Sequence, residues 1–105
     1  MVFEMSSKNR RRGKDLERWV AKYFGGRRVG ILGQEDVRLH WGCNIECKER
    51  AALPIFIYKS MAQAERNAAG SMAWVVLHQL GDEYENGLVI MRCKDVKTIL
   101  EKEGA

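Results

Sequence analysis

The segment from Gly33 to Cys47 constrains the fold most, because its apolar residues alternate with polar ones on both sides of a short loop. In chain order, these apolar residues and the loop between them are Val37, Leu39, His40-Trp41-Gly42, Cys43, Ile45 and Cys47. Such alternation is typical of two strands that each bury one face. If both apolar sets face one core, Leu39 lies opposite Cys43 and Val37 opposite Ile45. The segment therefore predicts a β-hairpin with a defined register, closed by a three-residue loop whose glycine suits a left-handed conformation.

The same register predicts a polar face opposite the buried one. On this face Asp36 lies directly opposite Glu46, and Lys48 follows two residues further along the strand. Directly opposed residues have Cβ atoms about 4.5–5.5 Å apart, so the two carboxylates repel each other unless a cation lies between them. Mg²⁺ suits this position, with Mn²⁺ as a substitute, because it binds carboxylate and phosphate oxygens.

These three side chains form a plausible site for hydrolysis of a phosphodiester. Asp36 and Glu46 are the predicted metal ligands. Lys48 is the predicted catalytic lysine, because its side chain could orient or deprotonate a water molecule, or neutralise charge that develops on a phosphoryl group.

The rest of the chain alternates between helical and strand patterns. We predict a helix over residues 13–25, a strand over 27–31 and the hairpin over 33–47. A second helix over 54–69, strands over 72–80 and 88–93, and a third helix over 94–103 follow. Apolar residues recur at helical spacing in the first segment, and Pro54 suits the first position of the second helix. The order α-β-β-β-α-β-β-α predicts an α/β fold with a mixed central sheet flanked by helices.

Positive charge is concentrated near the N-terminus. Residues 1–28 carry nine Lys/Arg against three Asp/Glu, whereas residues 29–105 carry nine against eleven. A basic segment of this kind suits a polyanion such as nucleic acid, although it is also typical of a solvated tail. We predict a flexible basic arm over residues 1–12 and a single domain over residues 13–105. The predicted DNA-binding residues are Lys8, Arg10, Arg11, Arg12, Lys14, Arg27 and Arg28.

Several other classes of protein and site are disfavoured. No apolar run approaches the roughly 20 residues that span a bilayer, and no apolar stretch follows the basic N-terminus as in a secretory signal. Three irregularly spaced cysteines do not form a disulfide framework, so we expect a cytoplasmic protein with no membrane partner. Zinc is disfavoured because Cys43 and Cys47 fit the buried face and the chain has no CxxC or HxxxH pair.

The order of elements and the residues Glu17, Asp36 and Glu46-Cys47-Lys48 resemble the PD-(D/E)XK nuclease superfamily. Within it, the chain looks most like the small Holliday junction resolvase-like proteins, including those carried by bacteriophages. The likeness runs from about Lys14 to Cys93. It implies a restriction-endonuclease-like core, with Glu17 as an outer ligand of metal or water and Gln63 as a supporting polar group near the site.

Residues and resemblance together predict a Mg²⁺-dependent endonuclease that hydrolyses DNA phosphodiesters and selects its substrate by shape. The resemblance implies a Holliday junction resolvase in a bacterial or phage-infected cell, and a homodimer that makes paired cuts in branched DNA. One alternative is a flap- or branch-specific nuclease of the same fold, such as the virus-type replication-repair nucleases. Another is a non-catalytic DNA-binding module that keeps the fold and the basic arm.

Overall fold

The computed structural model describes residues 2–29 and 36–104, with side chains described from Gly13 onward. The described elements form an α/β fold of three α-helices and two small antiparallel sheets. They group into two compact units, Met1–Ala51 and Ala52–Ala105, and each is described by itself. None of the helices in residues 2–29 and 36–104 is long and apolar enough to cross a membrane.

The first helix, α1, spans Val2–Phe24 and so begins well before Gly13, where apolar spacing placed its start. The predicted arm from residue 2 to residue 12 therefore has helical backbone. Those residues include several Lys and Arg and no proline, and a glycine inside a helix costs only about 1 kcal/mol, so Gly13 does not stop the helix. The helix ends at Gly25, which has a left-handed φ of 73°, and the Gly26 N–H donates to the Ala21 carbonyl at 2.8 Å.

Three short strands follow α1 and form one antiparallel sheet in the order β1-β2-β3. They are β1 (Arg27–Arg28), β2 (Val37–Arg38) and β3 (Asn44–Ile45). The predicted hairpin register is confirmed, because Val37 pairs with Ile45 and the Leu39 N–H donates to the Cys43 carbonyl at 2.8 Å. Gly42 closes the loop with a φ of 105°. Ile31 and the first residues of the predicted hairpin lie outside the described residues.

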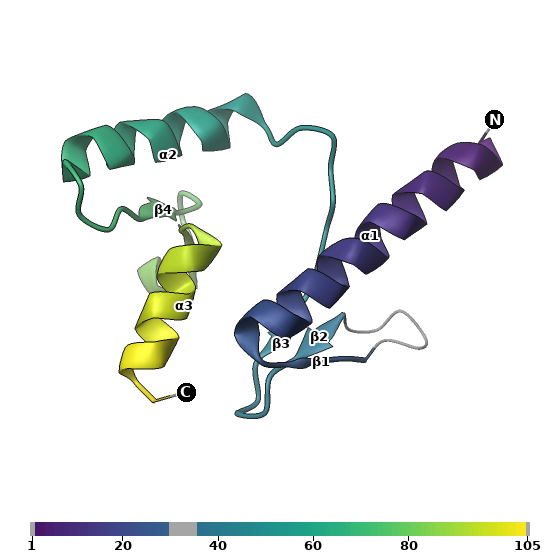
Figure 1. The fold of residues 1–105 in the computed structure, drawn as a ribbon. Helices are drawn as coiled ribbons and strands as arrows, with labels where there is room; N and C mark the ends of the chain where they lie inside the picture. The colour runs from purple at the N-terminus through teal and green to yellow at the C-terminus, as the bar shows by residue number, and fades with distance from the viewer. Residues whose placement is uncertain (1, 30–35, 105) are drawn as a thin grey trace. The chain divides into compact units, whose positions relative to one another are not determined.

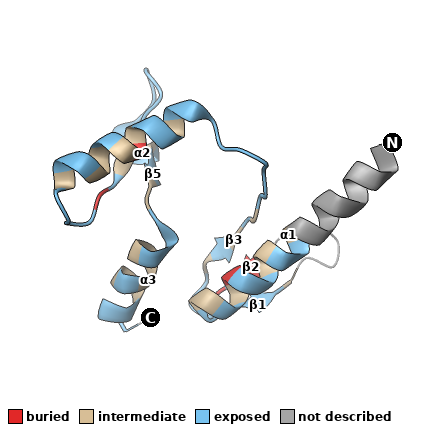
Figure 2. Cartoon of the chain, turned by 45° about the horizontal axis from the view of Figure 1, so that its top comes forward, coloured by how far each residue is buried: buried red, intermediate tan, exposed pale blue. Residues whose placement is uncertain are grey.

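The core of the first unit lies between α1 and the sheet. Figure 1 shows the C-terminal half of α1 beside the three strands, and Figure 2 shows buried positions on α1 and β2. Val20 of α1 packs with Val37, which is fully buried, and with Leu39. The partly buried residues around them are Leu16, Ala21, Phe24, Cys43, Ile45 and Cys47. The predicted inward face of the hairpin is therefore confirmed.

The second unit contains two helices and a two-stranded sheet. In chain order its elements are α2 (Ile55–Ala68), β4 (Val75–Leu77), the 3₁₀ turn η1 (Tyr84–Asn86), β5 (Leu88–Ile90) and α3 (Cys93–Lys102). Pro54 is the N-cap of α2, so the helix begins one residue later than predicted. Ala69 follows the helix as its C-cap, with a left-handed φ of 49°. Met61 is the buried residue of this helix.

The two sheets differ from the single mixed sheet that the order of elements predicted. β4 pairs with β5 antiparallel, with Val76 opposite Val89. Each described strand thus pairs only with a neighbour in sequence, in the antiparallel sense. A mixed sheet needs in addition a parallel pairing across a crossover segment such as α2, and alternation within single strands carries no information about such a pairing.

Replacement of Gly26 by alanine is expected to destabilise the protein. A Cβ atom at this position would lie 2.6 Å from Leu39 Cδ2 and 2.8 Å from the Arg38 carbonyl oxygen, so the first strand would have to shift. Overpacking of this kind costs typically 1–3 kcal/mol. Gly13→Ala is the matched control, because no atom lies within 4 Å of its added Cβ and the change favours the helix by about 1 kcal/mol. Urea unfolding of both variants measures the difference, and equal midpoints would contradict the close approach at Gly26.

A second expectation concerns the ion pair between α2 and the N-cap of α3. Arg92 Nε and Nη2 donate to the two carboxylate oxygens of Glu65 at 2.9 and 3.0 Å. These hydrogen bonds and the charge of Arg92 lower the pKa of Glu65. The pKa of Glu65 is lower in the folded state than in the unfolded state. The ion pair therefore stabilises the fold above the unfolded-state pKa, and this stabilisation is lost as the pH falls through the folded-state pKa. Arg92→Gln should therefore raise the pKa of Glu65 in an NMR titration, whereas Lys59→Gln should leave it unchanged.

Candidate functional site

Asp36 directly precedes β2 and Glu46 directly follows β3, and continuation of the pleat of the strands places both on the face of the sheet that points away from α1. Their neighbours Val37 and Ile45 pair with each other and pack against α1, so the pleat directs the preceding and following residues to the opposite face. Asp36 also reaches across to the next strand, where its Oδ2 accepts a hydrogen bond from the Cys47 N–H at 2.5 Å. One oxygen of the Asp36 carboxylate is thereby held beside Glu46-Cys47, as the register predicts.

Lys48 lies beside Glu46. Its Nζ atom is 3.5 Å from Glu46 Oε2, and both side chains are more than half exposed. An exposed pair of this kind contributes little to stability, because water and salt screen it. Its significance is geometric, since a carboxylate and an ammonium group lie together on a face that a large polyanion can approach.

Glu17 has a different partner from the one that the resemblance implies. Its Oε1 accepts a hydrogen bond from Arg28 Nε at 3.2 Å, and the Glu17 side chain is about a quarter exposed. Arg28 pairs with Val37 and therefore lies on the α1 side of the sheet, away from Asp36. In residues 2–29 and 36–104, no three His, Cys, Asp or Glu side chains gather into a group that could hold a metal ion. Glu17 thus does not join Asp36 and Glu46 here.

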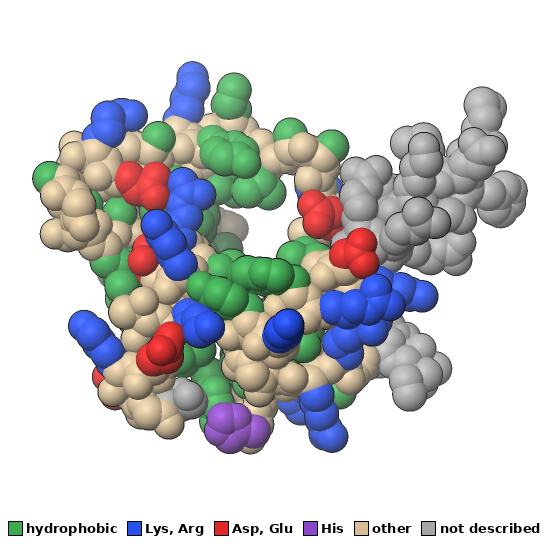
Figure 3. Space-filling view, in the orientation of Figure 1, with side chains coloured by type: hydrophobic (Ala, Val, Ile, Leu, Met, Phe, Trp, Pro, Cys, Tyr) green, Lys and Arg blue, Asp and Glu red, His purple; other side chains and the backbone are tan. Residues whose placement is uncertain are grey.

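The remaining predicted residues are spread over both units. Gln63 is exposed on α2 of the second unit, and its catalytic role stays a prediction. Lys14 and Arg27 are exposed in the first unit, whereas Arg28 forms the ion pair with Glu17. The side chains of Lys8, Arg10, Arg11 and Arg12 lie outside the described part. Figure 3 shows Lys and Arg side chains over both units, so basic residues are not confined to the first unit.

Arg38 is a basic residue of this face that charge clustering alone does not reveal. It lies two residues from Asp36 on β2, directly opposite both Arg27 on β1 and Asn44 on β3. Its Nε donates to Asn44 Oδ1 at 3.0 Å. The basic clusters near the N-terminus dominate the charge pattern, but the alternation in the hairpin places Arg38 on the same face as Asp36 and is the signal that identifies it.

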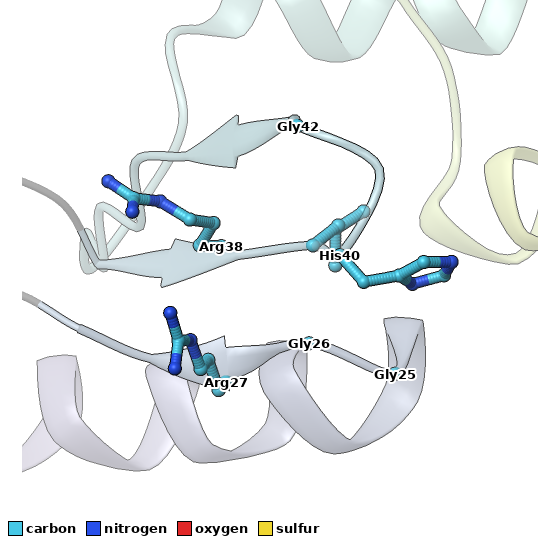
Figure 4. Close-up of a pocket in the computed structure, with 7 residues that line it drawn as sticks. Gly25, Gly26, Arg27, Arg38, His40 and Gly42 are labelled. Atoms are coloured by element: carbon cyan, nitrogen blue, oxygen red, sulfur yellow. The ribbon is translucent and has the colours of Figure 1, made fainter.

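A pocket of about 460 Å³ adjoins these arginines. It is lined by Gly25, Gly26, Arg27, Arg38, Leu39, His40 and Gly42. Figure 4 shows the two guanidinium groups toward one end of this pocket and the His40 ring toward the other. Its lining combines three glycines with Leu39, His40 and the two arginines, so two basic side chains of the first unit border the pocket.

The residues on the outward face fit a hard divalent cation. Mg²⁺ is usually held by one or two carboxylates together with waters and substrate phosphates, and Asp36 and Glu46 supply two carboxylates. Thiolate ligands for a softer metal are not offered on this face, because Cys43 and Cys47 belong to the core side.

Comparison of the chain with models of protein families, with curated proteins and with solved structures finds no match.

If Asp36 and Glu46 bind Mg²⁺ together, the metal should stabilise the fold, by about 2.7 kcal/mol at a concentration one hundred times the dissociation constant. Glu46→Gln removes one of the two ligands and should abolish most of the Mg²⁺-induced rise in melting temperature. Without metal, the same variant should melt at or slightly above the wild-type temperature, because the repulsion with Asp36 is relieved. Glu49→Gln is the control, since it removes a neighbouring exposed carboxylate outside the predicted pair. If Mg²⁺ raised the melting temperature of Glu46→Gln as much as that of the wild type, the proposed metal site would be contradicted.

Proposed function

We propose that this protein is a Mg²⁺-dependent endonuclease that hydrolyses DNA phosphodiester bonds and selects branched DNA by its shape. The observation that supports the proposal most is the shared face of Asp36, Glu46 and Lys48, in which the Lys48 ammonium lies 3.5 Å from the Glu46 carboxylate. Two carboxylates that can hold a divalent cation, with a lysine beside them, are suited to metal-assisted hydrolysis of a phosphate diester.

Each of these side chains has a distinct role in the proposed reaction. Asp36 is held by the Cys47 N–H and offers its carboxylate to the cation together with Glu46. When bound, Mg²⁺ supplies a Lewis acid for the phosphoryl oxygens. As an ammonium group, Lys48 orients the attacking water and offsets negative charge that develops on the phosphoryl oxygens. In its neutral amine form, Lys48 would instead take the proton of the attacking water.

The proposed substrate is a four-way DNA junction, and a homodimer is the assembly that would cut it symmetrically. Both follow from the resemblance to the resolvase-like PD-(D/E)XK nucleases and from the basic residues of the first unit. In that proposal the two sheets belong to one restriction-endonuclease-like core. A small chain has little surface for reading bases in a groove, which favours recognition of DNA shape and backbone over sequence.

A non-catalytic DNA-binding module is the second candidate. It is favoured by the Glu17–Arg28 ion pair, which occupies a carboxylate that the resemblance assigns to the metal site. A flap- or branch-specific nuclease would use the same residues as the resolvase and differ only in its substrate.

Cleavage of labelled four-way junction, flap and plain duplex, each with Mg²⁺ or with EDTA, tests these proposals together. We expect the wild type to cut the junction fastest and only with the metal. Glu46→Ala and Lys48→Ala should each lower the cleavage rate by about 10²–10⁴-fold, because each removes a group that acts on the reacting phosphate.

Glu49→Ala and Lys59→Ala are the matched controls, and both should cut at the wild-type rate. If the wild type binds these DNAs but cuts none of them with Mg²⁺ or Mn²⁺, the protein is a binding module. Preferential cutting of the flap would instead identify the branch-specific alternative.

A further inference from the structure

We propose that Arg27 and Arg38 form a second phosphate-binding subsite, which holds a phosphodiester next to the one that is cut. This inference rests on the proposed function and adds a substrate contact to the same face of the sheet. It also names Arg38, which lies outside the basic N-terminal segment, as a residue that binds DNA.

Two positive charges lie in one row across the three strands. Arg27, Arg38 and Asn44 lie side by side in one row of the outward face, since Arg38 pairs with both of the others. Two positive side chains in one row attract a bound anion more strongly than either does alone. Arg27 and Arg38 are thus two positive charges at opposed positions, just as Asp36 and Glu46 are two negative charges at opposed positions.

The side chains of Arg27 and Arg38 are suited to binding a phosphate group. Asn44 Oδ1 accepts the Arg38 Nε hydrogen bond at 3.0 Å, which restrains the plane of the guanidinium group before any ligand arrives. A guanidinium group binds phosphate oxygens through two parallel hydrogen bonds, so a restrained plane favours that geometry. Arg27, for its part, makes no side-chain hydrogen bond or ion pair within the described ranges.

The row of Arg27, Arg38 and Asn44 lies next to the row of Asp36 and Glu46. Asp36 directly precedes β2 and is two residues from Arg38, and Glu46 directly follows β3 and is two residues from Asn44. At about 3.4 Å per extended residue, the two rows are about 7 Å apart. That distance is comparable to the spacing of successive phosphodiesters on one strand. A DNA strand whose reacting phosphate lies at Asp36 and Glu46 therefore places a neighbouring phosphate at Arg27 and Arg38, beside the open pocket of Figure 4.

The test combines arginine variants with substrates in which one phosphate at a time, near the cut, is replaced by an uncharged methylphosphonate. Arg27→Gln and Arg38→Gln should each weaken DNA binding in EDTA by about tenfold or more, as expected for loss of a charged hydrogen bond. Each should also reduce the slope of log affinity against log salt by about one. Arg38→Lys should recover the salt slope but only part of the affinity, because lysine keeps the charge without the paired hydrogen bonds.

The methylphosphonate series identifies the phosphate. One position should slow wild-type cleavage about tenfold and have little further effect in Arg38→Gln, since both changes remove the same contact. Arg66→Gln is the control, because it removes an exposed arginine of the second unit and should behave as wild type in every assay.

The outcomes separate the two proposals. If the wild type cuts DNA but both arginine variants bind and cut as wild type does, the subsite is wrong and the proposed function stands. Methylphosphonate effects that stay the same in wild type and in Arg38→Gln would overturn the subsite equally. If the wild type cuts no DNA, the proposed function fails, and unchanged salt slopes for the variants in EDTA would then overturn the phosphate contact as well.

Discussion

The register of the β2–β3 hairpin is the constraint on which the rest of the first unit depends. Val37 is fully buried between α1 and the sheet, and its pairing with Ile45 fixes which residues face the core. A slip of one residue would turn every side chain to the other face, exposing apolar groups and burying Asp36 and Glu46. The core and the candidate site are therefore two consequences of a single pairing.

The two ends of the hairpin show how local chemistry supports this register. Gly26 allows the start of β1 to approach the Arg38 backbone and Leu39 closely, and Gly42 closes the loop in a conformation that other residues rarely adopt. At the other end the Asp36 carboxylate accepts the Cys47 N–H. A polar side chain of the candidate site thus also holds the strands together, which links the stability of the hairpin to its chemistry.

Much of the site could be predicted from sequence, because a strand has a period of two and a hairpin loop relates its strands. These rules placed Asp36, Glu46 and Lys48 on one face, and the structure confirms the register. They apply equally to Arg38, which the clustering of charge at the N-terminus obscures. Glu17 shows their limit, because helical spacing places it at the edge of the apolar face of α1 but does not identify Arg28 as its partner.

What the sequence determined by itself is local: the helical and strand segments, the three-residue loop and the face to which each hairpin side chain points. These features depend on backbone geometry and on apolar spacing over a few residues. Only the tertiary structure decided that Arg28 meets Glu17 and that the described strands form two antiparallel sheets. These outcomes depend on which surfaces distant segments bring together, and the spacing of residues within one segment does not encode that choice.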